Sequence, residues 1–219
     1  MLKTITKILF LQSSKEDIVK LNNGYLIIGL LCTWIVGMGR YWDNPRANIW
    51  QHLGVGSVIY VIVLSAFIWL IVLPFKLEKW SYFRLLTYIS LCSIPGILYA
   101  IPVEKFMSMD TAKSINAYFL GIVAIWRIML LFRFLKQLDN LSIDEIMTCV
   151  FLPIVLIINT LAILNLEHVV FNIMSGNDKT SVNDRAYILV LVLTIASWIL
   201  VLPLLINYIY SIYMRSKKQ

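Results

Sequence analysis

Long apolar runs constrain this chain more than any other feature, because about 20 consecutive apolar residues are what a helix needs to cross about 30 Å of hydrocarbon. Six such runs follow one another, separated by short polar loops. They cover approximately residues 24–39, 53–75, 84–102, 115–135, 146–166 and 186–211. Of all residues 60% are hydrophobic and only 14% charged, whereas soluble domains carry about a quarter charged residues. The sequence predicts an all-α, polytopic membrane protein, with six transmembrane helices bundled into a single domain over residues 1–219.

The lysines and arginines of the loops predict how this bundle is oriented. An even number of spans places both termini on one side, and the side richer in Lys and Arg faces the cytoplasm. Twelve of these residues fall on the side of the termini and six on the other side. We expect both termini in the cytoplasm, with residues 1–22 as a short cytoplasmic segment. The first span would act as an uncleaved insertion signal, because charges rather than small residues follow the first apolar stretch. A bacterial inner (cytoplasmic) membrane fits the short loops and the composition.

Two local patterns predict how the first helices begin and pack. Ser14 and Asp17 have the spacing of a capping box, in which each residue accepts a hydrogen bond from the other's backbone N–H. Two Gly-x-Gly pairs flank the loop after the first span, at residues 37–39 and 54–56. They lack the strand that would accompany a nucleotide-binding loop, so we expect them to let the first two helices approach closely.

Arg127 is the one basic residue deep within a predicted span. Burying an arginine in a membrane costs at least about 2.5 kcal/mol, so its side chain should face the interior of the bundle or reach toward the interface. Counting depth along the other spans places Asn159 and several hydroxyl groups at its level, but no carboxylate. The hydroxyl groups belong to Thr33, Ser65, Ser90 and Ser93. A positive, partly hydrated site of this kind would suit an anion, while the same groups could equally join helices as structural polar contacts.

A second group of candidate residues lies in the stretch "GMGRYWDNPR" and the next outer loop. Arg40, Asp43 and Arg46 come from the stretch, and Glu104 from the later loop. Pro45 suits the first position of a new helix capped by Asp43 or Asn44, and Arg46 would then attract an anion near that helix start. Aromatic residues beside arginines are also typical of anchors at the bilayer surface. The stretch therefore predicts either an interfacial anchor or a binding site.

Several chemistries find no support in the sequence. It contains none of the motifs of intramembrane proteases, phosphate-binding loops or serine hydrolases, and no catalytic residue can be assigned. The three cysteines lie in apolar runs without metal-ligand spacing, and two histidines with scattered acids make no metal site. We expect neither a metal nor a cofactor, and we expect the basic residues to set topology rather than to bind nucleic acid.

Three classes of function remain open. The first is a non-enzymatic membrane protein that binds or transports an anionic or lipid-like ligand, with Arg40, Asp43, Arg46, Glu104, Arg127 and Asn159 as ligand-binding residues. The second is an accessory, complex-subunit or immunity-type protein that contacts another membrane protein. The third is an enzyme on a lipid-linked substrate, with Asp43, Glu104 or His52 as acid or base. The first is favoured slightly over the second, and the partners expected are the bilayer and an anionic lipid headgroup or small anion.

Overall fold

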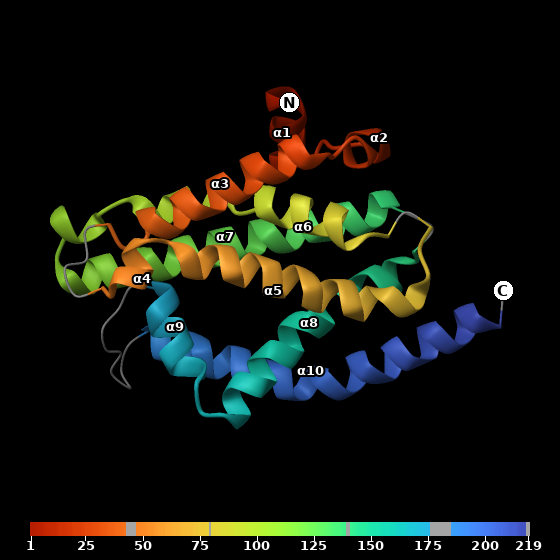
Figure 1. Cartoon of the computed structure of the whole chain (residues 1–219). Helices are drawn as coiled ribbons and strands as arrows, with labels where there is room; N and C mark the ends of the chain where they lie inside the picture. Colours follow the sequence, from red (N-terminus) through yellow and green to blue (C-terminus); the bar gives the residue numbers. More distant parts are fainter. Residues whose placement is uncertain (43–46, 79, 139–140, 176–184, 218–219) are drawn as a thin grey trace. The chain divides into compact units, whose positions relative to one another are not determined.

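A computed structural model describes residues 1–42, 47–78, 80–138, 141–175 and 185–217. Backbone alone is described for Glu104, Met109, Asp110, Lys113, residues 172–175 and residues 185–186. All regular elements among these residues are helices (Figure 1). The predicted all-α class is therefore confirmed for the described part of the chain.

Five helical stretches are long and apolar enough to cross a membrane: Val55–Phe75, Tyr82–Ala100, Ser114–Leu138, Ile143–Ile163 and Tyr187–Ser216. They match five of the six predicted runs, and they make the chain a multi-pass membrane protein by length and composition. The first predicted run forms α3 (Asn23–Gly39), an apolar helix of 17 residues that is shorter than the other five. A sixth span and the orientation of the termini stay predictions.

The chain falls into two compact units. Unit 1 comprises Met1–Pro102 and Ile122–Ser142, and unit 2 comprises Val103–Gly121 and Ile143–Gln219. The long helix α7 (Met109–Leu138) contributes its second half to unit 1 and its first half to unit 2.

The N-terminal segment, residues 1–22, forms two short helices in unit 1. Helix α1 (Leu2–Leu9) stops in a Schellman turn, because Leu11 adopts a left-handed φ of 61° and the N–H of Gln12 bonds to the carbonyl of Lys7 at 2.8 Å. Helix α2 (Lys15–Val19) begins with the predicted capping box between Ser14 and Asp17, which is confirmed. The turn that ends α1 and the capping box that begins α2 are both formed by residues close in sequence. This segment therefore folds into a defined structure rather than an extended tail.

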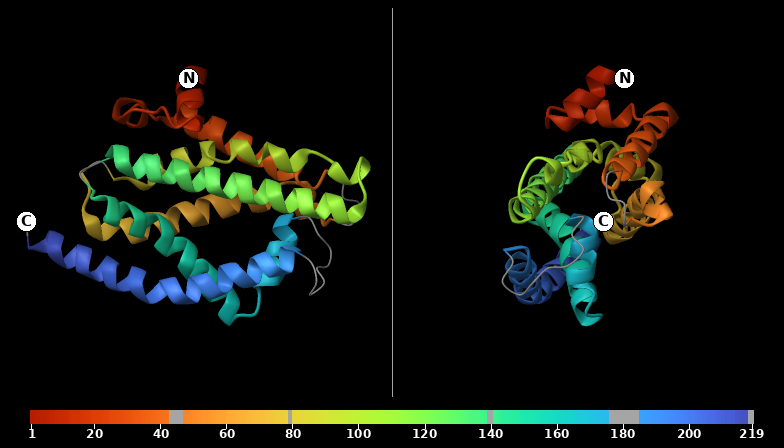
Figure 2. Two further views of the ribbon diagram at one scale, coloured as in Figure 1. Left: turned by 180° about the vertical axis from the view of Figure 1, so that it is seen from behind. Right: turned by 90° about the vertical axis from the view of Figure 1, so that its left-hand side faces the viewer.

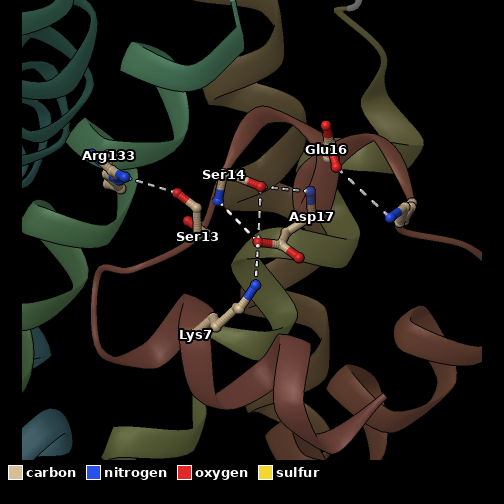
Figure 3. A network of polar contacts seen from close by, with 7 residues as sticks. Lys7, Ser13, Ser14, Glu16, Asp17 and Arg133 are labelled. Carbon is tan, nitrogen blue, oxygen red and sulfur yellow. Dashed lines mark hydrogen bonds and ion pairs between the residues drawn. The ribbon is translucent and has the colours of Figure 1, made fainter.

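Polar contacts hold the N-terminal segment together and attach it to α7. The Asp17 carboxylate accepts hydrogen bonds from the backbone and the hydroxyl of Ser14, both at 3.0 Å, and pairs with the Lys7 ammonium at 3.4 Å (Figure 3). Arg133 Nη2 donates to the carbonyl of Ser13 at 2.9 Å. Both helices consequently lie against the flank of α6 (Tyr82–Leu91) and α7, not beyond their ends (Figure 2).

Small and hydroxylated residues bring α3 and α6 together. A Cβ atom added at Gly29 would lie 2.1 Å from the Ser90 hydroxyl, so only glycine permits this approach. One helical turn further on, the buried Thr33 hydroxyl lies 2.6 Å from that of Ser93. Lipid offers no hydrophobic force that would join two apolar helices, so close backbone approach and hydroxyl bonds do this work inside a bilayer.

The predicted contact between the first two spans is confirmed for two of the four glycines. Helix α5 (Val55–Val72) starts at Gly54, whose φ of 65° suits glycine, and whose missing side chain leaves room for the α3 backbone. A Cβ at Gly37 would meet Ser57 at 2.6 Å. Gly39 instead lies against Ala100, and Gly56 faces open space, so the prediction is wrong for these two glycines. Before α5, the short helix α4 (Ile49–His52) starts after Asn48. The helix start predicted at Pro45 lies outside the described residues.

In unit 2, α8 (Ile143–Ile163) and α10 (Arg185–Ser216) pack through a polar seam. Arg215 forms two bonds to the Glu145 carboxylate, at 2.6 and 3.1 Å, and Asn207 donates to Thr148 at 2.7 Å. Helix α9 (Glu167–Ser175) lies between them in sequence and was not predicted. Pro153 lies within α8 and Pro203 within α10.

Gly29→Ala should destabilise the protein by about 1–3 kcal/mol, because the added methyl group overlaps Ser90 and the α6 backbone. Gly56→Ala is the matched control, since nothing lies within 4 Å of the added atom, and it should be neutral or slightly stabilising. Thermal unfolding of both variants in detergent measures the difference. Equal midpoints for the two variants would contradict the close α3–α6 contact.

Asp17→Ala should loosen α2 by about 0.5–2 kcal/mol, the usual value of a lost cap. Glu16→Ala removes only an exposed carboxylate 4.0 Å from Lys20, so it serves as control and should change little. Hydrogen exchange of the α2 amides measures the effect.

The same network should make α2 sensitive to acid. Hydrogen bonds from the Ser14 backbone, and then from its hydroxyl and Lys7, hold the pKa of Asp17 below its ordinary 3.8. A lowered pKa means that the carboxylate stabilises the fold above pH 3.8 and that this contribution disappears as pH falls through the lowered value. Amide protection in α2, corrected for the chemical exchange rate, should therefore hold from neutral pH to about 4 and then fall.

Candidate functional site

Arg127 lies in the half of α7 that belongs to unit 1. Its position is explained by Pro95, which follows helix α6. Helix α6 ends at Leu91 and continues as the 3₁₀ helix η2 (Ile94–Ala100), in which Gly96 N–H bonds to the carbonyl of Ser93. Pro95 has no N–H with which to continue this pattern to Cys92. The Cys92 carbonyl instead accepts a hydrogen bond from Arg127 Nε at 3.2 Å. The arginine thus satisfies a carbonyl at the negative end of a helix.

Gly96 provides the space in which the rest of the Arg127 guanidinium lies. A Cβ atom at this position would be 3.2 Å from Arg127 Nη2, 3.4 Å from the Tyr99 ring and 2.9 Å from Val36. The Arg127 guanidinium and the Tyr99 ring therefore both lie next to Gly96. Any side chain larger than hydrogen would displace one of these neighbours.

Arg40 approaches the same tyrosine from the end of α3. It is the C-terminal capping residue of that helix, and its guanidinium carbon lies 4.4 Å from the centre of the Tyr99 ring. This distance is typical of a cation–π contact, worth about 0.5–2 kcal/mol depending on how far it is desolvated. Two predicted site residues, Arg40 and Arg127, thus lie close to Tyr99, which was not predicted.

The charge of this arginine–tyrosine group, defined as Arg40, Tyr99 and Arg127, is not balanced by any described side chain. Within the described residues no carboxylate forms an ion pair with either arginine, and Arg127 makes the single hydrogen bond to Cys92. Both arginines are half-buried. Arg40 on the Tyr99 ring and Arg127 beside Gly96 therefore leave several N–H donors for a further acceptor.

Of the other predicted site residues, the structure describes the side chain of Asn159 alone. Asp43 and Arg46 lie outside the described residues, and for Glu104 the structure describes only the backbone, in the 3₁₀ helix η3 (Val103–Lys105) of unit 2. Asn159, also in unit 2, donates to the carbonyl of Val155 in its own helix at 2.8 Å. None of the described contacts of Asn159 points to a ligand.

The hydroxyl groups expected near Arg127 bond elsewhere. Ser65 donates to Val61 and Ser90 to Thr87, each within its own helix, while Thr33 and Ser93 bond to each other and to nearby carbonyls. Such bonds to carbonyls three or four residues back are the usual use of Ser and Thr in apolar helices. The acceptor for Arg127 is a backbone carbonyl, for which the only sequence signal is Pro95.

No family model, curated protein or solved structure matches the chain. The function has to be argued from the residues themselves.

The remaining polar side chains of the described residues offer no catalytic arrangement. No group of three or more His, Cys, Asp and Glu side chains lies together within them. His52 ends helix α4 in unit 1, whereas His168 stacks on Tyr187 in unit 2, with ring centres 4.3 Å apart. The Glu145–Arg215 pair is a structural contact between α8 and α10.

Arg127→Leu should fold with a stability within about 2 kcal/mol of wild type. Losing the bond to Cys92 costs about 1–3 kcal/mol, and removing a charge from a membrane span returns at least about 2.5 kcal/mol. Phe134→Ala, which empties a fully buried ring position in the same helix, should cost about 3–5 kcal/mol and serves as comparator. Folded yield and unfolding midpoints measure both. A collapse of yield for Arg127→Leu alone would mean that Arg127 is a structural hub and not a ligand contact.

Proposed function

We propose that this multi-pass membrane protein binds an anionic ligand, with a phosphate or carboxylate group held by Arg40 and Arg127 beside Tyr99. One observation carries the proposal: two half-buried arginines lie close to Tyr99, Arg40 over its ring and Arg127 beside the neighbouring Gly96, and neither pairs with a carboxylate among the described side chains. A ligand anion would supply the missing countercharge. The protein acts in this proposal as a binding protein, without a catalytic step.

The chemistry of arginine favours an oxyanion over other ligands. Guanidinium groups present planar pairs of N–H donors that match carboxylate and phosphate oxygens, and such charge-assisted bonds are about twice as strong as neutral ones. The Arg127 Nε–H is already used by Cys92, so its terminal nitrogens remain for the ligand. The Tyr99 hydroxyl can add one further donor.

The topology we propose places this site toward the outer half of the bilayer. If α3 crosses the membrane as a sixth span and both termini are cytoplasmic, Arg40 at the end of α3 reaches the outer surface. A phospholipid headgroup of the outer leaflet and a free anion would both carry the required oxygens. Exposed aromatic residues near this end, Trp42 at 54% and Trp50 at 72% exposure, fit contact with the interfacial region.

Binding can be measured on the purified protein in a neutral detergent. The probes are inorganic phosphate, a short-chain phosphatidylglycerol and a short-chain phosphatidylcholine, with thermal stabilisation and calorimetry as readouts. Arg40→Gln and Arg127→Leu should each weaken binding of the anionic probe by about tenfold or more, the effect of losing a charge-assisted bond. Gly96→Ala, which displaces Arg127 without changing charge, should weaken it as well.

Controls separate the site from general charge effects. Lys20→Gln removes one exposed positive charge elsewhere in unit 1 and should leave binding unchanged. Preference for phosphatidylglycerol over phosphate would identify a lipid headgroup, and the reverse a free anion. Binding that is equal in wild type and in an Arg40→Gln/Arg127→Leu double variant would refute the proposed function and leave protein recognition or enzymatic activity as the alternatives.

A further inference from the structure

The N-terminal segment carries a second surface, with features that the arginine–tyrosine group does not use. We propose that α1 is an in-plane helix that binds anionic phospholipid at the membrane interface, with its exposed apolar side in the acyl region and its lysines at the phosphates. The surface consists of Leu2 and Lys3 of α1, Phe10 at the C-terminal cap of that helix, and Lys15 of α2. It involves neither Arg40 nor Arg127, so it stands or falls independently of the proposed function.

Two hydrogen bonds fix the depth of α1 relative to α7. Trp126 Nε1 donates to the carbonyl of Leu9 at 2.8 Å, and Arg133 Nη2 donates to that of Ser13 at 2.9 Å. The two donors are seven residues apart, which corresponds to about 10 Å along a helix. Both lie within the apolar stretch Ser114–Leu138, and Arg133 belongs to its charged end. The carbonyl of Leu9, at the end of α1, thus lies level with Trp126 and about 10 Å further into the apolar stretch than Arg133. This is the deep limit of the roughly 5–10 Å to which interfacial helices are buried.

The sequence of α1 divides its circumference into three sectors at 100° per residue. The first sector holds Ile5 and Ile8, which are 7% and 0% exposed and pack inside unit 1. The second holds Leu2 and Phe10, which are 82% and 61% exposed. The third holds Lys3 and Lys7. An exposed apolar sector between a buried one and a basic one is the pattern of a helix that lies in an interface.

Charge complementarity selects an anionic lipid as the occupant. Lys7 pairs with Asp17, which accounts for the one buried acid of the segment (Figure 3). Lys3 and Lys15 are exposed, and neither forms an ion pair within the described residues. A protein partner would need a surface both apolar and acidic at bilayer depth, whereas a leaflet containing anionic phospholipid already has both properties there. Each such lysine strengthens binding to an anionic membrane by about fivefold.

The depth can be tested on the full chain reconstituted into phosphatidylcholine vesicles with and without phosphatidylglycerol. Spin labels are attached at Leu2→Cys and, separately, at Phe10→Cys, in a Cys32→Ala background because Cys92 and Cys149 are buried. Power saturation with oxygen and a water-soluble nickel complex should place both labels about 5–10 Å below the phosphates. Labels that are accessible to nickel but not to oxygen would overturn the proposal and point to an aqueous, protein-binding surface.

The lipid preference is tested by photo-crosslinking headgroup-labelled phosphatidylglycerol and phosphatidylcholine to the full chain. The crosslinks within residues 1–22 are then counted after proteolysis. Wild type should prefer the anionic lipid, and Lys3→Gln and Lys15→Gln should each lower that preference by up to about fivefold. Lys217→Gln, at the other end of the chain, is the matched control and should change nothing at residues 1–22. Equal crosslinking of both lipids in wild type, or no loss in a Lys3→Gln/Lys15→Gln double variant, would refute recognition of anionic lipid. Hydrogen-exchange protection of α2 confirms that each variant retains the folded segment.

Discussion

A backbone carbonyl within a membrane span needs a partner, because lipid supplies no hydrogen-bond donor. In unit 1 this constraint acts at Cys92, where Pro95 removes the N–H that would continue the 3₁₀ pattern. Arg127 supplies the missing donor. The proline thereby explains why a charged residue is retained deep in α7, and why its guanidinium lies next to Gly96 and Tyr99.

The packing of the helices around this site is also explained by the lipid that surrounds them. Hydrophobic attraction does not join helices in lipid, so α3 approaches α6 where Gly29 faces Ser90, and the hydroxyls of Thr33 and Ser93 bond across the contact. This close approach keeps the end of α3 near η2. As a consequence Arg40, the residue that caps α3, reaches the face of Tyr99.

Predictions that depended on local sequence were the successful ones. Apolar runs gave five membrane-length helices, and the Ser14–Asp17 spacing gave a capping box, since each is decided by neighbouring residues. Predictions of partners between distant residues were weaker, because depth along a span does not specify which way a side chain points. Of the hydroxyls expected near Arg127, those of Ser65 and Ser90 bond within their own helices and those of Thr33 and Ser93 bond to each other. Gly56 faces open space although its sequence context resembles that of Gly37.

Tyr99 shows why sequence reasoning did not find the whole site. Nothing distinguishes it from the other tyrosines at span ends until η2 is known to be a 3₁₀ helix, whose turns of about three residues differ from those of an α-helix. That change of helix type follows a proline, and it rotates Tyr99 relative to where an α-helical count would place it. The proline therefore has two effects: it frees the carbonyl that accepts a hydrogen bond from Arg127, and it turns the Tyr99 ring toward Arg40. A substitution of Pro95 would alter both contacts together, whereas Gly96→Ala acts on Arg127 and Tyr99 without restoring the missing N–H.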